Sequence, residues 1–227
     1  MALIHLETKL HDIVMTDPTV VTVLNRFGIE LGVGDNTVGS ICLKHGMNSD
    51  FFMTILNTYL SSEYFPEKVL SSFSANLIVD YLNKTNSYYE QFQIPNIERH
   101  FSFLLQKSDA QNSNLALMMQ FFVEVKAELL QRISDDRLRW FPEVLELDTK
   151  HSTKDLHIVH FEEENDSIED KIDDLISMFV IHLKGKYDHN LCQAVLIALT
   201  SLKKDITQNN RIRNRILKPL SQALLNC

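Results

Sequence analysis

Glycine, proline and cysteine are scarce in this chain of 227 residues, which contains six, five and three of them respectively. So few glycines and prolines leave little to interrupt regular structure, and long stretches repeat apolar residues at three-and-four spacing, which favours helices almost throughout. Cys42, Cys192 and Cys227 are odd in number and far apart, which argues against a disulfide framework or a paired-thiol metal site. We therefore expect an all-α protein of the reducing cytoplasm.

Long uncharged apolar runs are missing as well. No window approaches the ~18 apolar residues that a membrane span requires. His5, Glu7 and Lys9 interrupt the beginning of the chain, where a signal peptide would be continuously apolar. The composition, 44% hydrophobic and 23% charged, is that of a globular chain that can bury a core. The sequence thus predicts a soluble protein that does not associate with membranes.

Positive charge is in deficit, with 22 Lys and Arg against 30 Asp and Glu, a net charge of −8. Phosphate contacts need a positive surface, so nucleic-acid binding is not expected as the main activity. The charge is unevenly placed: residues 161–175 carry eight acids and one lysine, and residues 203–218 carry six basic residues and one acid. Antiparallel helices would bring these segments side by side to neutralise each other; the alternative is a basic binding patch.

The order of the predicted elements suggests two domains. Residues 1–60 form several short helices, with a helix start at Thr16-Asp17-Pro18 and a tight connection over residues 27–35, which hold three of the six glycines. The serine-rich segment 61–72 is expected to be the linker. Residues 73–227 are then predicted to form a four-helix bundle.

Four long helices are expected in the bundle, over residues 73–105, 111–140, 162–184 and 189–225. Pro95 predicts a kink in the first of them, and Phe141-Pro142 predicts the end of the second. The long connector that follows suits one extended crossover in a bundle.

Each long helix has an apolar stripe that polar residues interrupt. The positions are Asn86, Arg132, Asp136, Asn165, Asn209 and Arg213. Two pairs among them, Arg132/Asp136 and Asn209/Arg213, have i, i+4 spacing, so each pair projects from one helix face. Bundles build metal sites in this way from histidine and glutamate. Here the geometry is present but the chemistry differs, because asparagine is a poor iron ligand and arginine offers no lone pair.

With these residues in view, the whole chain resembles the iron–sulfur cluster repair di-iron proteins, which join a short N-terminal domain to a hemerythrin-like bundle. Residues 20–27 followed by Gly28-Ile29-Glu30 are similar to the family's arginine-phenylalanine-glycine-isoleucine-acid signature. The family commonly continues with two adjacent cysteines, where this chain has Gly32-Val33.

The resemblance also implies where the di-iron ligands would lie. Histidines would fall at Asn86, Arg132, Asn165 and Asn209, and carboxylates at Asp136 and Arg213, so only Asp136 keeps a ligand residue. The resemblance therefore implies no cofactor. We expect the arginines to take the electrostatic role of the lost metal, in a buried network with Asp136 and the amides.

Two other clusters of residues are candidate sites. His151, His157 and His160 lie close to Glu162, Glu163 and Glu164 and are an alternative zinc or iron site. Cys42 near His45 would suit a nucleophile and its base, but no further partner can be named. The sequence has no Walker loop, dinucleotide fingerprint or serine-hydrolase elbow, so we do not expect an enzyme.

The hypothesis is a metal-free, degenerate relative of the repair proteins that acts as a regulatory or protein-interaction module in stress response. Its partner would be another protein or a paralogue, bound through residues 1–60, and homo-oligomerisation is left open. The alternative is a functional non-haem iron protein with a rebuilt site, acting in iron–sulfur repair or the response to nitric oxide or oxidative stress. A small-ligand sensor that uses the polar bundle centre is a third interpretation.

Overall fold

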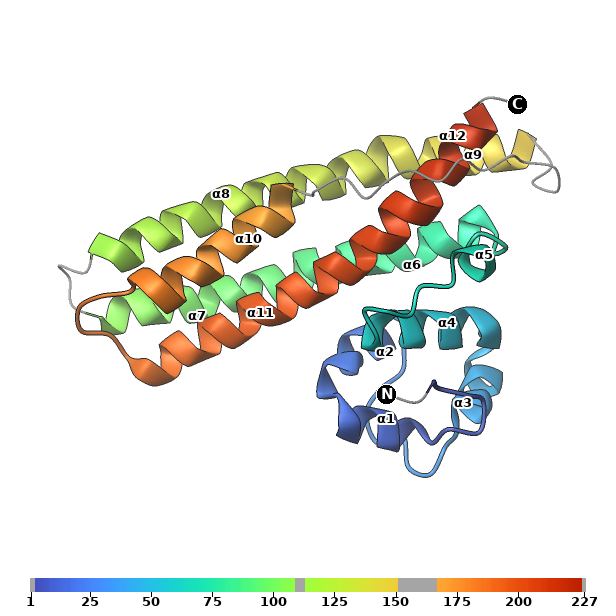
Figure 1. Ribbon diagram of the computed structural model, residues 1–227, viewed down its shortest axis with the longest axis horizontal. Helices are drawn as coiled ribbons and strands as arrows, with labels where there is room; N and C mark the ends of the chain where they lie inside the picture. The colour runs from blue at the N-terminus through green and yellow to red at the C-terminus, as the bar shows by residue number, and fades with distance from the viewer. Residues whose placement is uncertain (1–2, 109–112, 151–166, 226–227) are drawn as a thin grey trace.

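A computed structural model describes residues 3–108, 113–150 and 167–225. All regular elements among these residues are helical, and one isolated bridge joins Lys9 and Thr37 (Figure 1). The predicted all-α class is therefore confirmed. None of the described helices has the length and low charge that crossing a membrane would require.

Residues 3–60, here called the N-terminal unit, form five short helices: α1 (Leu10–Thr16), η1 (Pro18–Val20), α2 (Val21–Arg26), α3 (Val38–His45) and α4 (Ser49–Leu60). The helix start expected at Asp17 is present, because its side chain accepts the hydrogen bond of the Thr19 N–H ahead of a first-turn proline. The connection after α2 needs glycine at Gly28 and Gly32, whose φ angles of 70° and 90° are left-handed.

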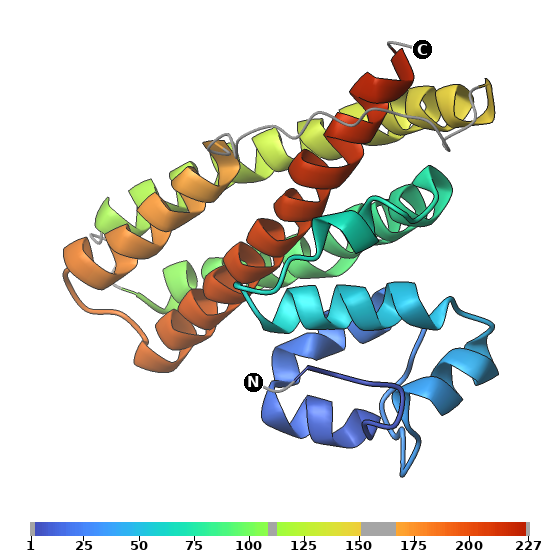
Figure 2. The same cartoon turned by 45° about the vertical axis from the view of Figure 1, so that its right-hand side comes forward.

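The rest of the described chain forms four long helical rods. The first rod contains α6 (Ala75–Tyr88), η2 (Tyr89–Gln93) and α7 (Ile94–Lys107); the second contains α8 (Ser113–Asp135), η3 (Asp136–Trp140) and α9 (Phe141–Lys150). The third contains α10 (Ser167–Ser177) and η5 (Met178–His182), and the fourth contains α11 (His189–Ile212), η6 (Arg213–Leu217) and α12 (Lys218–Leu225). Successive rods run in opposite directions and pack side by side (Figures 1 and 2).

Each rod contains one π-helical turn, and three of these turns are followed by a proline. Pro95, Pro142 and Pro219 each come two residues after a π turn, namely η2, η3 and η6. In a regular helix a proline clashes with the carbonyl four residues earlier. Here that carbonyl lies inside the π turn, where hydrogen bonds span five residues, as from Ile94 N–H to the Tyr89 carbonyl.

This arrangement corrects one expectation from the sequence. Phe141-Pro142 does not end the second rod, which continues as α9 to Lys150. The reason is the π turn η3 immediately before, which lets the chain carry a proline without stopping the helix. A kink is expected at Pro95, and the structure has the π turn η2 just before this proline.

Residues 61–72, the predicted linker, are docked on the fourth rod. They contain the short helix α5 (Glu67–Leu70), whose Leu70 is fully buried. Two guanidinium groups contact the Phe65 ring, whose centroid lies 4.5 Å from the guanidinium of Arg211 and 4.4 Å from that of Arg215. Arg215 also forms an ion pair with Glu67.

The N-terminal unit and the near ends of the first, second and fourth rods share one apolar core. Buried side chains from α4, such as Phe52, belong to the same cluster as Leu82 of α6, Val144 of α9 and Leu220 of α12. A second cluster fills the far half of the rods. The division into 1–60, 61–72 and 73–227 remains a prediction about folding units.

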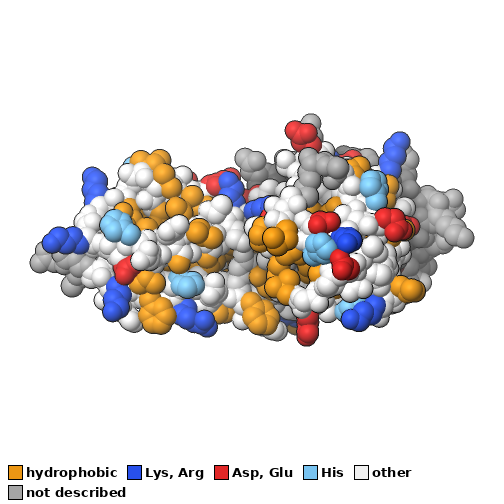
Figure 3. All heavy atoms as spheres, turned by 90° about the horizontal axis from the view of Figure 1, so that it is seen from below, with side chains coloured by type: hydrophobic (Ala, Val, Ile, Leu, Met, Phe, Trp, Pro, Cys, Tyr) orange, Lys and Arg blue, Asp and Glu red, His pale blue; other side chains and the backbone are white. Residues whose placement is uncertain are grey.

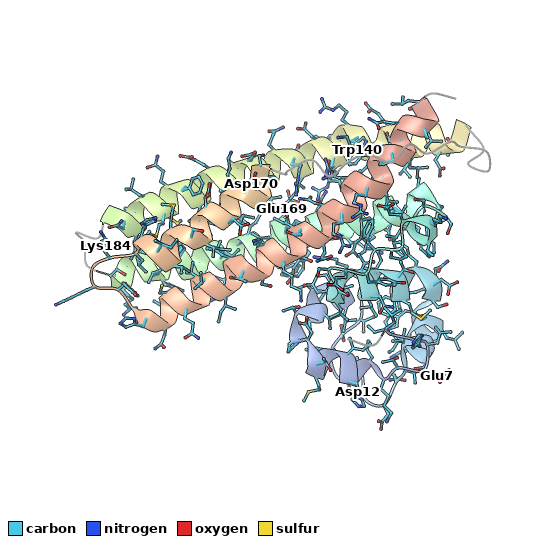
Figure 4. The ribbon with its side chains drawn as sticks, viewed as in Figure 1. Glu7, Asp12, Trp140, Glu169, Asp170 and Lys184 are labelled. Atoms are coloured by element: carbon cyan, nitrogen blue, oxygen red, sulfur yellow. The ribbon has the colours of Figure 1, made fainter. Side chains whose placement is uncertain are left out.

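The expected neutralisation of the acidic and basic segments is partly confirmed. Lys203 of α11 forms an ion pair with Asp173 of α10, and Glu169, which faces α11 in Figure 4, accepts hydrogen bonds from Thr207 and Asn210. Three further basic side chains pair with acids outside the acidic segment: Lys204 with Asp17, Arg213 with Asp136 and Arg215 with Glu67. These cations are thus spread over several ion pairs. On the face shown in Figure 3, Lys and Arg are likewise scattered singly.

Candidate functional site

Three of the six predicted polar positions meet between the helical rods, and we call Asn86, Asp136 and Arg213 the central triad. Asn86 lies near the end of α6, and Asp136 and Arg213 are the first residues of the π turns η3 and η6. The Asp136 Oδ2 atom accepts a hydrogen bond from Arg213 Nη1. It accepts another from Asn86 Nδ2, which lies 3.3 Å away. Asp136 is only 3% exposed. Sequence spacing thus located a real contact between three helices.

The triad is completed on one side by Trp140, which Figure 4 places where the second and fourth rods pass each other. The Arg213 guanidinium lies over the Trp140 ring, 4.4 Å from its centroid. A guanidinium therefore touches both a buried carboxylate and an aromatic face. Such a cation can only donate hydrogen bonds, so this group of residues brings one carboxylate and no imidazole to the centre.

Asn209 belongs to a neighbouring group, although the sequence placed it with the triad. Its amide nitrogen lies 3.0 Å from the Tyr89 hydroxyl, to which it donates, and 3.2 Å from Oδ1 of Asp205. The Thr85 hydroxyl donates to its carbonyl oxygen at 3.5 Å. The prediction that one closed network joins all these positions is therefore wrong for Asn209, which bonds to residues outside the triad.

The remaining predicted positions differ in how far the structure places them. Arg132 is half-buried and close enough to Tyr89 for its charge to oppose the rise in the Tyr89 pKa, which burial causes. Asn165 lies outside the described residues, as do His151, His157 and His160. Within the described part of the chain, no three His, Cys, Asp or Glu side chains group closely enough to hold a metal ion.

Sequence reasoning missed the most deeply buried charges in the structure. Arg26, the last residue of α2, forms an ion pair with Asp205 of α11, and both side chains are fully buried. Arg26 also donates to the Tyr81 hydroxyl at 3.1 Å, and its guanidinium lies 5.4–5.8 Å from the ring centroids of Tyr81, Tyr88 and Tyr89. We call Arg26, Tyr81, Tyr89, Asp205 and Asn209 the junction cluster.

The electrostatics of the junction cluster keep Arg26 charged. Burial works to lower the pKa of the guanidinium, but Asp205 and the tyrosines raise it, and it ends well above its ordinary value. Burial raises the pKa of Tyr81 and Tyr89, so both hydroxyls are neutral donors or acceptors. One signal was available in the sequence: Asp205 precedes Asn209 and Arg213 at four-residue steps, on the same face of the fourth rod.

A surface pocket of about 810 Å³ opens at the junction cluster. One wall is the connection from Asn25 to Glu30, which carries the family-like signature. The other wall belongs to the first rod, with Ser87, Tyr88 and Phe92 among its residues. Arg26 and Tyr88 therefore belong to both the pocket and the surroundings of the buried ion pair.

Cys42 does not have the properties of a catalytic nucleophile. It is 3% exposed, and burial raises the pKa of its thiol. A reactive cysteine needs the opposite shift and access to a substrate.

Comparisons with known proteins add no assignment to this geometry. A scan against protein-family models, a search of curated proteins and a search of solved structures each found no significant match to the chain.

Proposed function

We propose that this chain is a metal-free, hemerythrin-like relative of the iron–sulfur cluster repair proteins that acts as a regulatory or protein-interaction module in the cytoplasmic stress response. The observation that carries the proposal is the central triad, in which Arg213 lies on the Asp136 carboxylate. The antiparallel rods and the polar residues at the expected ligand positions agree with such an origin.

The physical argument concerns charge. A buried carboxylate needs a positive partner, which a metal ion supplies in a di-iron centre and Arg213 supplies here. A metal binding at Asp136 would have to displace the guanidinium of Arg213, which cannot lose its proton, and would break this ion pair. The triad therefore supports a structural role for these residues and not a role in metal binding.

The protein-interaction part of the proposal rests on the N-terminal unit. Large apolar side chains are well exposed there, with Met15 at 81%, Leu31 at 63% and Leu43 at 86%. A protein partner that docks on this unit would cover these side chains and remove their apolar surface from water. We expect Leu31→Ser and Leu43→Ser to weaken binding of that partner, while Val180→Ser on the third rod leaves it unchanged.

Iron analysis tests the metal-free part. Protein purified from iron-supplemented cells, and then titrated anaerobically with Fe(II), should contain far less than one iron per chain. The matched comparison restores the family-like ligands with Asn86→His, Arg132→His, Asn165→His, Asn209→His and Arg213→Glu, and this variant should gain iron. About two irons in the natural chain, with an oxo-bridge absorption band, would instead support the alternative, a non-haem iron protein with a rebuilt site.

A further inference from the structure

We propose that the buried Arg26–Asp205 pair is a latch that couples docking of the N-terminal unit to the order of the polar residues inside the bundle. The pair joins residues 179 positions apart, one at the end of α2 and one in α11. Both side chains have no exposed surface, and among the residues that the structure describes the buried Arg26 Nε atom has no hydrogen-bond partner. This contact does not depend on whether the bundle binds metal.

The latch continues into the bundle through hydrogen bonds. Asp205 holds Asn209, and Asn209 donates to the Tyr89 hydroxyl on the first rod. Asn209 lies one helical turn before Arg213, and Tyr89 lies one turn after Asn86. The junction cluster and the central triad therefore share adjacent turns of the first and fourth rods, through Tyr89 and Asn86 on one and Asn209 and Arg213 on the other, where a shift in one turn moves the next.

Burial makes this contact behave as a two-state element. If the N-terminal unit separates, Arg26 leaves with it, and Asp205 must either remain buried without a cation or draw water into the cluster. Either outcome disturbs Asn209 and Tyr89. By thermodynamic linkage, a disturbance of the cluster also weakens docking of the N-terminal unit. A partner that binds the N-terminal unit would thereby change the interior of the bundle.

The fourth rod supplies a matched control for this idea. Lys204, one residue before Asp205, also connects to the N-terminal unit, through Asp17 at 2.7 Å. The side chains of Lys204 and Asp17 are 34% and 26% exposed, so water can replace that pair when it breaks. If the buried pair is a latch, breaking it should weaken docking of the N-terminal unit far more than breaking the partly exposed Lys204–Asp17 pair.

Hydrogen exchange of the full-length chain tests the latch with the variants Arg26→Met, Asp205→Leu, the double variant and Lys204→Met. Each single change in the buried pair should accelerate exchange in residues 20–29 by about a hundredfold or more, because it leaves one buried charge unpaired. The Trp140 emission should shift in both, while exchange in residues 115–130 stays as in the natural chain. The double variant should return close to natural protection, and Lys204→Met should change little.

Several outcomes would overturn the latch. Faster exchange confined to residues 20–29, with an unchanged Trp140 emission, would show that the pair supports docking but is not coupled to the central triad. Equal effects of Lys204→Met and Arg26→Met would show that the buried pair is no more important than other contacts of the interface. If a single variant does not fold, Arg26→Lys replaces it, since it keeps the charge but loses the forked geometry. No change in exchange or emission with Arg26→Lys would then contradict the proposal.

Discussion

Arg213 donates a hydrogen bond to the carboxylate of Asp136 from a rod that is 77 positions further along the chain. Both residues are the first of a π-helical turn, and each turn is followed by a proline. π turns widen a helix locally and occur often at functional sites. The irregular backbone of both turns thus begins at the two residues whose side chains form an ion pair.

Removing the acid of this pair should destabilise the bundle. We expect Asp136→Ala to lower the free energy of unfolding by about 2–4 kcal/mol, below the range for fully buried pairs because Arg213 is 21% exposed. Glu143→Ala, an exposed change on α9, should stay within about 0.5 kcal/mol. Urea unfolding measures both, and equal midpoints would mean that the triad contributes nothing.

The only tryptophan of the chain reports on the same pair. Arg213→Met should weaken the cover over the Trp140 ring and move its emission to longer wavelength, with stronger quenching by acrylamide. Arg139→Met is the control, because that arginine is adjacent in sequence but 70% exposed. A shift of the same size in the control would contradict the stacking of Arg213 on Trp140.

Docking of the predicted linker can be tested by limited proteolysis. The separation into residues 1–60 and 73–227 predicts first cleavage within residues 61–72, leaving a stable bundle fragment. Phe65→Ala removes the ring that contacts Arg211 and Arg215, each contact being worth about 0.5–2 kcal/mol, and should speed this cleavage. Glu63→Ala, an exposed change, should not. Cleavage that begins inside the rods would show that the division is wrong.

Alkaline pH should unfold the protein through its buried tyrosines. Burial raises the pKa of Tyr59 to about 12 in the folded state, whereas an unfolded tyrosine titrates near its ordinary value. The unfolded state therefore loses its proton first, so the stability is complete below pH ~10 and falls as the pH rises toward ~12. Tyr59→Phe should reduce this dependence by about 2–3 kcal/mol across that range. Urea midpoints between pH 9 and 12, together with tyrosinate absorbance, would check the expectation, and an unchanged dependence in Tyr59→Phe would refute it.

The sequence by itself determined the helical class and the approximate extent of the rods, because helix periodicity and capping are local properties. Asp17 caps its helix as expected, and the four rods lie close to the predicted ranges. Spacing also marked Asn86, Asp136 and Arg213 as inward-facing, because each interrupts an apolar stripe. The prediction that Phe141-Pro142 ends a helix failed, because the effect of Pro142 depends on the π turn before it.

Only the tertiary structure decided which polar side chains meet. Asn209 and Arg213 share a helix face, yet one contacts Tyr89 and Asp205 while the other contacts Asp136. Arg26 finds its partner in a distant part of the sequence, because docking of the N-terminal unit packs α2 against α6 and α4 against α11, which brings Arg26 to Asp205. Helix periodicity fixes the face on which a charge lies, but the partner of a buried charge is set by packing between segments that are distant in sequence.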